Sequence, residues 1–268
     1  MDETVRVCTY NVRRDVDEDG RFAWDGRREA VASTLRFHRP DIVGLQEPLD
    51  HQYDDLRGAL DAYEWEGRPR YGGEREGEFC PVGYRTKRFE RVAGDTFWLS
   101  ETPEEAGSVG WDATYPRIAT WVRLRDRETG TALTYCNTHL DHEGERARSE
   151  AARLLLERLP EISDDGEGTT PAVVAGDCNA TPDDEPYRIL AGTDEFESPL
   201  SDARLATPHP PHGPTTTRTD YESLRPDRRI DHVFVRECGV DHYGVAADLA
   251  GDGTYPSDHL PVVVDLEI

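Results

Sequence analysis

Five short segments of the sequence place charged or amide side chains directly after an apolar stretch. These segments are residues 9–13 (TYNVR), 45–47 (LQE), 137–142 (NTHLDH), 176–182 (GDCNATP) and 256–259 (PSDH). Short apolar stretches predict β-strands, and the end of a strand can hold a polar side chain rigidly. One such segment alone would be an ordinary loop carboxylate. Five at successive strand ends predict one active site that is assembled from most of the chain.

The residue types in these segments suit the hydrolysis of a phosphate ester with the help of a divalent cation. Hard cations such as Mg²⁺ bind oxygen ligands, typically one or two carboxylates plus waters, and Glu47 and Asp258 could supply them. A carboxylate such as Asp177 could remove the proton from the attacking water. The imidazole of His259 could stabilise the charge that grows on the phosphoryl oxygens. Asp231, in the segment RIDHVFV, is the candidate partner that orients this imidazole and raises its pKa.

Two arginines are candidates for binding the substrate phosphate, because a guanidinium group presents a planar fork of donors. Arg117 lies in the segment PRIATW, and Arg148 lies on the helix predicted after THLDH. For each of them the alternative is a structural ion pair with one of the many acidic residues. Asp141 either belongs to the site or braces it from outside.

Four further histidines are not assigned to the site. His142 and His232 directly follow motif residues, and we interpret them as structural histidines. His209 and His212 lie in a proline-rich stretch, where we expect them to be solvated rather than to act as ligands.

The motif residues must be positioned by strands, since each follows an apolar stretch of strand length. Alternation and apolar runs predict strands at residues 5–10, 41–45, 79–85, 95–100, 118–125, 132–139, 172–175, 229–235, 242–247 and 260–266. Helical spacing predicts helices at residues 24–38, 51–60 and 143–159, with loops at residues 66–78 and 199–228. Strands and helices interleave, and no linker-like stretch or internal repeat divides the sequence. We therefore predict one α/β domain that spans residues 1–268.

The bulk composition predicts a globular protein of the cytoplasm. Hydrophobic residues make up 36% of the chain and charged residues 32%, and no apolar run approaches the length of a membrane span. The first residues are acidic and lack the basic and apolar stretches of a secretory signal. The five cysteines are widely spaced and form no CxxC pair, so we expect free thiols in a reducing compartment.

The charge is strongly unbalanced. The chain has 55 acidic and 31 basic residues, its formal net charge is -24, and Lys87 is its single lysine. The acidic residues are spread along the chain, as in proteins from salt-accumulating halophiles. In molar salt the screening length falls to roughly 3 Å, so that self-repulsion becomes tolerable. We therefore interpret the charge as a sign of habitat rather than of substrate.

The motifs TYNVR, LQE, THLDH, GDCNATP, RIDHVFV and PSDHLPV, in this order, resemble the endonuclease/exonuclease/phosphatase superfamily, which includes deoxyribonuclease I and the nocturnin-like deadenylases. The resemblance runs from residue 9 to residue 262. It implies a fold of two mixed β-sheets packed as a sandwich with flanking helices, with the site at one end of the sheets. Residues 97–103 (FWLSETP) resemble a prokaryotic branch near the nocturnin-like enzymes.

The resemblance also implies a metal shell. Asn11 and Glu47 match metal-shell positions, and Asp258 matches a further metal ligand. The cation that the resemblance implies is Mg²⁺ or Mn²⁺.

Five more residues match positions that carry the chemistry. Asp177 resembles the residue that activates the water, and Asn179 the residue that orients the water or the phosphate. His259 with Asp231 resembles the His–Asp pair, in which the imidazole acts either as a base or as a charge stabiliser. His139, in THLDH, matches a position near the scissile phosphate.

Three functions remain open. The resemblance favours a metal-dependent phosphodiesterase or nuclease that uses a carboxylate-activated water on a phosphoester such as nucleic acid or a nucleotide. The alternatives are a phosphomonoesterase for a small metabolite or lipid head group, and a non-catalytic binding module. Selectivity lies in loops around such a site, so the motifs do not choose the substrate. The one basic run with an aromatic residue, residues 68–71 (RPRY), is interpreted as a solvated loop, and we expect a monomer that does not bind membranes.

Overall fold

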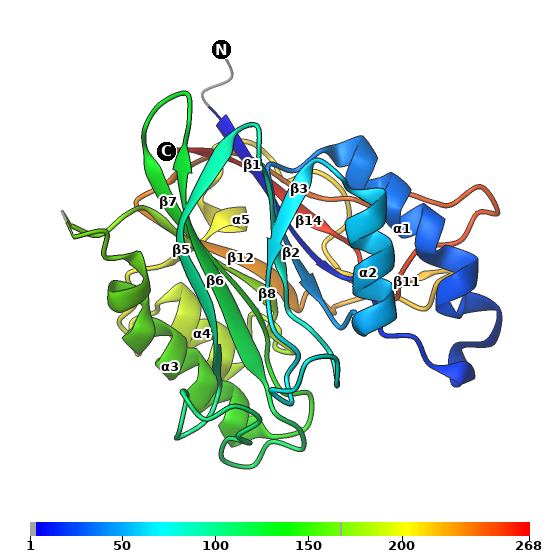
Figure 1. The fold of residues 1–268 in the computed structure, drawn as a ribbon, viewed down its shortest axis with the longest axis horizontal. Coiled ribbons are helices and arrows are strands. Elements are labelled where there is room, and N and C mark those ends of the chain that lie inside the picture. The colour runs from blue at the N-terminus through cyan, green and yellow to red at the C-terminus, as the bar shows by residue number, and fades with distance from the viewer. Residues whose placement is uncertain (1–3, 167) are drawn as a thin grey trace.

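Two six-stranded β-sheets pack face to face in the computed structural model, which describes residues 4–166 and 168–268 (Figure 1). Both sheets contain parallel and antiparallel pairs, and helices flank the sandwich on both sides. The predicted fold of two mixed sheets with flanking helices is therefore confirmed.

The strand order places the two parallel pairs in the middle of their sheets. The first sheet runs β13 (Gly239–Val245), β14 (Val262–Glu267), β1 (Thr4–Asn11), β2 (Ile42–Gln46), β4 (Val82–Arg85) and β3 (Tyr63–Glu66). The second runs β5 (Phe89–Trp98), β6 (Ile118–Asp126), β7 (Ala132–His139), β8 (Ala172–Asp177), β12 (Asp231–Arg236) and β9 (Ser201–Asp202). A separate two-stranded pair consists of β10 (Arg218–Thr219) and β11 (Leu224–Arg225).

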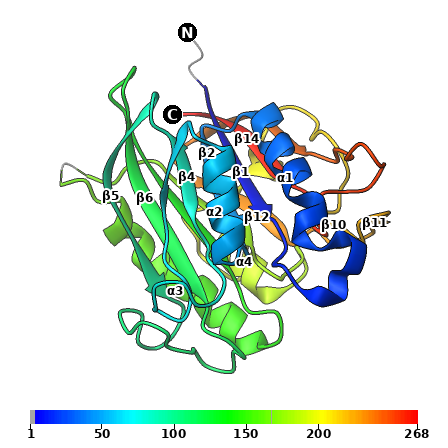
Figure 2. The ribbon, with the colours of Figure 1, turned by 45° about the vertical axis from the view of Figure 1, so that its right-hand side comes forward.

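Helices cover the outer face of each sheet. The first sheet carries α1 (Trp24–His38) and α2 (Asp50–Ala59), and the second carries α3 (Glu145–Ser163) and α4 (Glu185–Ala191), as the turned view in Figure 2 also shows. The 3₁₀ helix η1 (Asp17–Phe22) and the single turn α5 (Ala203–Ala206) complete the helical elements of the described residues. None of these helices combines the length and the apolar character that crossing a membrane requires.

The alternation of β1 shows how the sequence builds the core. Successive side chains of a strand point to opposite faces of its sheet. Val5 and Val7 are therefore buried between the two sheets, in the same cluster as Tyr135 of the second sheet. Tyr10 points the other way and packs in a cluster with Leu35 of α1. Each sheet thus has two buried faces, one against the other sheet and one against helices.

The two parallel pairs bring four of the motifs to one end of the sandwich. Parallel strands need a crossover, which α1 provides between β1 and β2, and α3 between β7 and β8. Asn11 is paired with Gln46 at the end of the first pair, and His139 with Asp177 at the end of the second. The antiparallel strand β12 places Asp231 opposite Asp177.

A buried polar contact links the two sheets just below this end. The side-chain amide of Asn137 on β7 donates to the carbonyl oxygens of Leu45, at 2.7 Å, and Pro81, at 3.0 Å. Its oxygen accepts a hydrogen bond from Gln46 Nε2 at 2.6 Å. A Cβ atom on Gly44 would meet the Asn137 side chain at 2.6 Å. The glycine is therefore needed for the close approach of the two sheets.

Gly44→Ala is expected to destabilise the protein by about 1–3 kcal/mol, because the added methyl group overpacks a fully buried contact. The measurement is the free energy of unfolding from denaturant titration at constant salt. The matched control is Gly58→Ala on α2, where a Cβ meets no atom within 4 Å. Alanine in that helix should be neutral or stabilising by up to about 1 kcal/mol. Equal unfolding free energies for the two variants would contradict the packing argument.

Several short elements differ from the prediction. The strand β3 and the helix α4 are absent from the predicted list, and residues 199–228, predicted as a loop, contain β9, α5, β10 and β11. These elements have two to seven residues, too few to show a period. The helix predicted at residues 143–159 continues to Ser163 with Pro160 inside it. Ser163 Oγ donates to the carbonyl of Leu159 in this last turn.

Candidate active site

Three strand ends meet through the amide of one asparagine. Asn11 closes β1, Glu47 follows β2, and Asp177 closes β8. The Nδ2 atom of Asn11 donates to Glu47 Oε1 at 2.9 Å and to Asp177 Oδ2 at 3.0 Å. Asn11 and Asp177 are almost completely buried. Asn11 therefore fixes two carboxylates from different sheets beside each other.

The backbone at these positions takes uncommon conformations. Glu47 has φ = 71° and Asn179 has φ = 45°, both in the left-handed region that residues other than glycine rarely occupy. Gly176 has φ = 148°, and a Cβ there would come within 1.9 Å of the carbonyl oxygen of Thr138. Strained positions of this kind persist where the surrounding structure holds them, often at functional sites.

His259 is held as a buried cation between two aspartates. Its Nδ1 lies 2.9 Å from Asp231 Oδ2, and its Nε2 lies 3.6 Å from Asp177 Oδ2. Burial alone would lower the pKa of His259, but the charges of Asp231 and Asp177 outweigh burial and raise this pKa to about 9. The imidazole is therefore protonated at neutral pH, with Nδ1 donating to Asp231 and Nε2–H directed at Asp177.

Asp177 titrates close to neutrality. Burial, followed by the charge of Asp231, raises the pKa of Asp177 to about 6, although the charge of His259 acts in the opposite direction. The backbone NH of Asn179 donates to Asp177 Oδ1 at 2.9 Å. A carboxylate with a pKa near the working pH can both exist in its ionised form and accept a proton from water.

His139 is a neutral imidazole beside the same carboxylate. Its Nε2 lies 3.1 Å from Asn179 Nδ2 and 3.4 Å from Asp177 Oδ2. Burial and the nearby Arg117 hold the pKa of His139 well below its usual value. The Asn179 amide also donates to the carbonyl of Leu140 at 3.0 Å, so that the asparagine and the imidazole are fixed together.

Glu47 is ionised although it is half-buried. Burial raises the pKa of Glu47, whereas His139, the backbone NH of Arg14 and the Asn11 amide lower it, and the net shift is strongly downward. Because His139 is itself neutral, we attribute the low pKa of Glu47 to the hydrogen bonds, which are 2.9 Å long from Arg14 N and from Asn11 Nδ2. Both oxygens keep lone pairs for a further partner.

The donor atoms of this centre fit a divalent cation. Ligand atoms of Glu47, Asp177 and His259 lie within 4.8 Å of one another. His259 is protonated and so offers no lone pair, which leaves two carboxylates, the donor type that hard divalent cations bind. The predicted ligand Asp258 lies outside this cluster. Its Oδ2 accepts a hydrogen bond from Arg218 at 2.9 Å, and its buried Oδ1 has no hydrogen-bond partner among the described residues.

Of the two arginines predicted to bind phosphate, Arg117 borders the site and Arg148 does not. Arg117 lines the cavity that also borders Glu47, Asp177 and His259, and its Nε donates to Asp141 Oδ2 at 3.2 Å. Asp141 is buried, and its Oδ1 accepts hydrogen bonds from the backbone NH groups of Glu143 and Gly144. These bonds fix the carboxylate that in turn positions the Arg117 side chain. Arg148 donates to the carbonyl of Asp141 and lines a different surface hollow.

A cavity of about 240 Å³ opens over the carboxylates. Its wall contains Glu47, His139, Asp177, Asn179 and His259 from the motifs. The remaining wall is strongly basic and comes mostly from loops; its arginines are Arg13, Arg14, Arg70, Arg117, Arg218 and Arg228. The excess of acidic residues over the whole chain is therefore reversed locally at the mouth of the site.

Glu78, which the sequence did not single out, organises this basic wall. Its carboxylate is buried and lies 2.7 Å from Arg70 Nη1, 3.3 Å from Arg14 Nη1 and 4.0 Å from Arg117 Nη1. Burial raises the pKa of Glu78, against the effect of these arginines. Arg70 also lies over the Tyr115 ring at 4.8 Å. The interpretation of residues 68–71 as a solvated loop is therefore wrong for Arg70, which is buried. The Arg- and Glu-rich composition of this loop was the only sequence feature that pointed to paired charges here.

The two structural histidines named in the sequence have clear partners. His232 is fully buried; its Nε2 lies 2.8 Å from the carbonyl oxygen of Ala180 and its Nδ1 lies 3.2 Å from Arg229 Nη1. Burial and the Arg229 charge lower the pKa of His232 to about 4. His142 accepts from Arg117 Nη2 at 2.8 Å and lies parallel to the Tyr115 ring at the cavity wall.

Residues 8–259 match the Endonuclease/Exonuclease/phosphatase family. The chain belongs to this family. It is similar to nocturnin of Xenopus laevis, with 23% identity over 98% of this chain and 72% of that protein. The matched part of the chain spans 42% of the length of the Drosophila melanogaster nocturnin, compared with 72% of the Xenopus laevis protein.

Solved structures of the endonuclease/exonuclease/phosphatase family agree with this fold over nearly the whole chain. A family protein of Bacteroides vulgatus is 35% identical, with a TM-score of 0.90 over 99% of both chains. The mannosyl-6-phosphatase of Bacteroides thetaiotaomicron VPI-5482 is 33% identical, with a TM-score of 0.89 over 98% of this chain and 99% of that one. The chain is accordingly a metal-dependent phosphoester hydrolase, as the motifs predicted, while the roles of individual residues stay predictions.

Proposed function

We propose that the chain is a Mg²⁺- or Mn²⁺-dependent phosphomonoesterase that acts on a small phosphorylated molecule such as a sugar phosphate. The observation that carries this proposal is the cavity of about 240 Å³ with six arginines in its wall. Cavities for drug-sized ligands measure about 300–1,000 Å³, so this one suits a small substrate. A terminal phosphate carries two negative charges, which a basic wall stabilises more strongly than the single charge of a diester. The similarity to a mannosyl-6-phosphatase supports the same substrate class.

Glu47 is the principal residue that would hold the cation, with Asn11 fixing its orientation and Asp177 as the second carboxylate of the cluster. When bound, the cation supplies positive charge that polarises the phosphoryl oxygens and lowers the barrier to attack.

Asp177 accepts the proton of the attacking water. Its pKa of about 6 leaves it mostly ionised at neutral pH, and the backbone NH of Asn179 and the Asn11 amide fix both of its oxygens. The Asn179 side chain, locked to His139 and to the Leu140 carbonyl, borders the same cavity and orients the water or the phosphate.

His259 acts as a charge stabiliser in this proposal rather than as a base. Its pKa of about 9, maintained by Asp231, keeps it protonated at neutral pH, so it has no free lone pair with which to accept a proton. A buried imidazolium that borders the cavity can donate to a phosphoryl oxygen as negative charge accumulates there. His139 is neutral, and its Nε2 lies beside the Asn179 amide, so His139 positions Asn179 rather than adding positive charge.

One observation favours a phosphodiesterase as the second candidate. The parallel rings of Tyr115 and His142, with centroids 6.3 Å apart, line the cavity, and a nucleobase can stack on such rings. On this alternative the arginines would follow the phosphates of a nucleotide or a single strand.

The deciding experiment is hydrolysis in concentrated KCl with Mg²⁺ or Mn²⁺, with Asp177→Asn as the blank for contaminating activity. The panel contains hexose phosphates, p-nitrophenyl phosphate, bis-p-nitrophenyl phosphate and single-stranded RNA. We expect kcat/KM for the monoesters to exceed that for the diesters by at least about tenfold. Cleavage of the diester or of RNA without phosphate release from monoesters would overturn the proposal in favour of the second candidate.

The surface charge fits a chain that works in the cytoplasm of a salt-accumulating cell. With a formal net charge of -24, transfer from about 1 M to about 0.01 M KCl lengthens the screening distance from roughly 3 Å to roughly 30 Å and strengthens self-repulsion. We expect the far-ultraviolet circular dichroism of the folded chain to disappear on this transfer and to return with salt. NaCl serves as the control and should restore the spectrum at the same concentration as KCl, because screening depends on ionic strength. An unchanged spectrum at low salt would refute the halophilic interpretation.

A further inference from the structure

A β-bulge in β13 turns two neighbouring polar side chains to the same face. Val240 is paired with Leu266 and His242 with Asp265, so Asp241 is an extra residue in the strand. In a regular strand Asp241 and His242 would point to opposite faces. Here Val240 and Tyr243 are buried, whereas Asp241 and His242 both reach solvent, with side-chain exposures of 33% and 61%. Bulges re-aim side chains in this way and are common near functional sites.

The segment at residues 207–213 is tied along this bulged strand and brings a second histidine to it. Thr207 Oγ1 donates to the carbonyl of Asp241 at 3.0 Å. Further along, His212 N donates to the Tyr243 carbonyl at 2.9 Å, and Val245 N donates to the His212 carbonyl at 3.0 Å. His209 lies between these two attachments, so its position beside Asp241 is set by the backbone.

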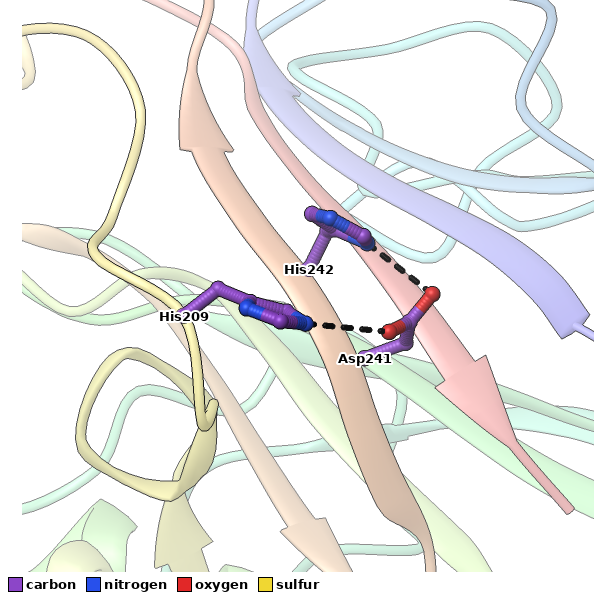
Figure 3. Close-up of side chains that lie close together, drawn as sticks. All are labelled: His209, Asp241 and His242. Atoms are coloured by element: carbon purple, nitrogen blue, oxygen red, sulfur yellow. Dashed lines mark ion pairs between the residues drawn. The ribbon is translucent and has the colours of Figure 1, made fainter.

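His209, Asp241 and His242 form a compact cluster (Figure 3). His209 Nε2 lies 3.8 Å from Asp241 Oδ1, and His242 Nδ1 lies 2.9 Å from Asp241 Oδ2. The two imidazole rings are stacked with centroids 4.8 Å apart and an interplanar angle of 20°. His209 is exposed, as expected for a solvated side chain, and the bulge and the tied segment also give it two specific neighbours.

The donor atoms suit a first-row transition metal rather than Mg²⁺. One ligand atom from each of the three residues lies within 4.8 Å of the others. Imidazole nitrogen with one carboxylate is a donor set for zinc, whose bonds of about 2.0–2.2 Å place tetrahedral ligands roughly 3.3 Å apart. The distances of 3.8 and 2.9 Å bracket that value, and on binding the two stacked, exposed rings would turn so that a nitrogen lone pair of each points at the ion.

We propose that His209, Asp241 and His242 form a second metal site, for Zn²⁺ or a similar transition metal, that clips residues 207–213 to β13. The site is separate from the catalytic centre. His242 is paired with Asp265 of β14, and Asp265 is paired in turn with Arg6 of β1, which lies five positions before Asn11. None of the three residues of the proposed metal site lines the catalytic cavity. Water completes the coordination, as an exposed three-ligand site allows.

The test is calorimetric titration of the full chain in concentrated KCl with Zn²⁺, comparing the wild type with His209→Ala and His242→Ala. The wild type is expected to bind one equivalent more than either variant, or to bind that equivalent at least tenfold more tightly. Co²⁺ in place of Zn²⁺ should give a visible absorption band that is lost in both variants. Zinc should also raise the Tm of the wild type more than that of the variants.

The matched control is His51→Ala. His51 is an exposed histidine whose Nε2 lies 3.0 Å from the carboxylate of Asp15, and among the described residues no second histidine contacts that carboxylate. It should leave the zinc stoichiometry unchanged. Identical zinc binding by the wild type and the two variants would overturn the site and leave an ion pair only. Equal loss in His51→Ala would overturn it as well, because any histidine–carboxylate pair would then suffice.

Discussion

Asp177→Asn is expected to lower kcat by about 10²–10⁴-fold while changing KM little, the range over which a positioned general base contributes. Asparagine has nearly the same shape and can still accept the Asn179 NH, but it cannot take a proton from water at any working pH. The Asn11 amide donates to the other oxygen, so the amide group of the variant would face one donor there. The measurement is steady-state kinetics on the preferred monoester at saturating metal.

Asp183→Asn is the matched control for this variant. Asp183 lies six residues further along, in the loop that follows β8, and is exposed. It removes one charge from the same region without touching the cluster and should leave kcat within about twofold, since exposed surface changes rarely matter. Activity of Asp177→Asn near that of the wild type would remove Asp177 from the role of base. Loss in both variants would point to a general effect of charge on the fold.

The strand-end motifs could be predicted from sequence for a physical reason. Each joins a buried strand, recognisable by its apolar pattern, to a polar residue whose place is then fixed within a residue or two. Asn11, Asp177 and Asp231 accordingly lie at the ends of β1, β8 and β12. The helix at Trp24–His38 has the predicted bounds, because a full amphipathic period precedes the stop at Pro40. The sequence therefore predicts well the positions of those site residues that a strand holds in place.

The walls of the cavity could not be predicted in the same way. Arg70 and Glu78 lie in a stretch without period, and the buried pairing between them depends on how the loop folds back over the site. Asp258 illustrates the same limit within a motif. Its place after Ser257 is fixed by the chain, but its ion pair is with Arg218 of the two-residue strand β10, forty residues away. A contact between segments far apart in the chain leaves no pattern in the local sequence. The cavity wall, on which substrate selectivity depends, could therefore not be predicted from the sequence.

Glu47→Gln is expected to raise the concentration of Mg²⁺ or Mn²⁺ needed for half-maximal activity by about 10–100-fold or more, since even partners of metal ligands contribute that much. The Glu47 carboxylate is ionised at any working pH, because its hydrogen bonds hold its pKa far below the usual range, so it always offers a charged oxygen to the cation. Glutamine removes the charge and places an NH₂ group opposite either the Arg14 NH or the Asn11 amide. A donor facing a donor costs about 1–3 kcal/mol, so the unfolding free energy should fall as well.

These two effects of Glu47→Gln can be separated. The metal titration is run at a temperature where circular dichroism shows the variant fully folded, so that loss of stability does not enter the activity. Glu76→Gln removes the same charge from the exposed part of the loop that carries Glu78, and it should leave the titration unchanged. A wild-type metal titration for Glu47→Gln would mean that the cation is held by Asp177, the other carboxylate of the cluster, rather than by Glu47. Asp258 Oδ1, buried without a partner among the described residues, would then be the donor to test next, because a buried carboxylate oxygen is costly to leave unpaired.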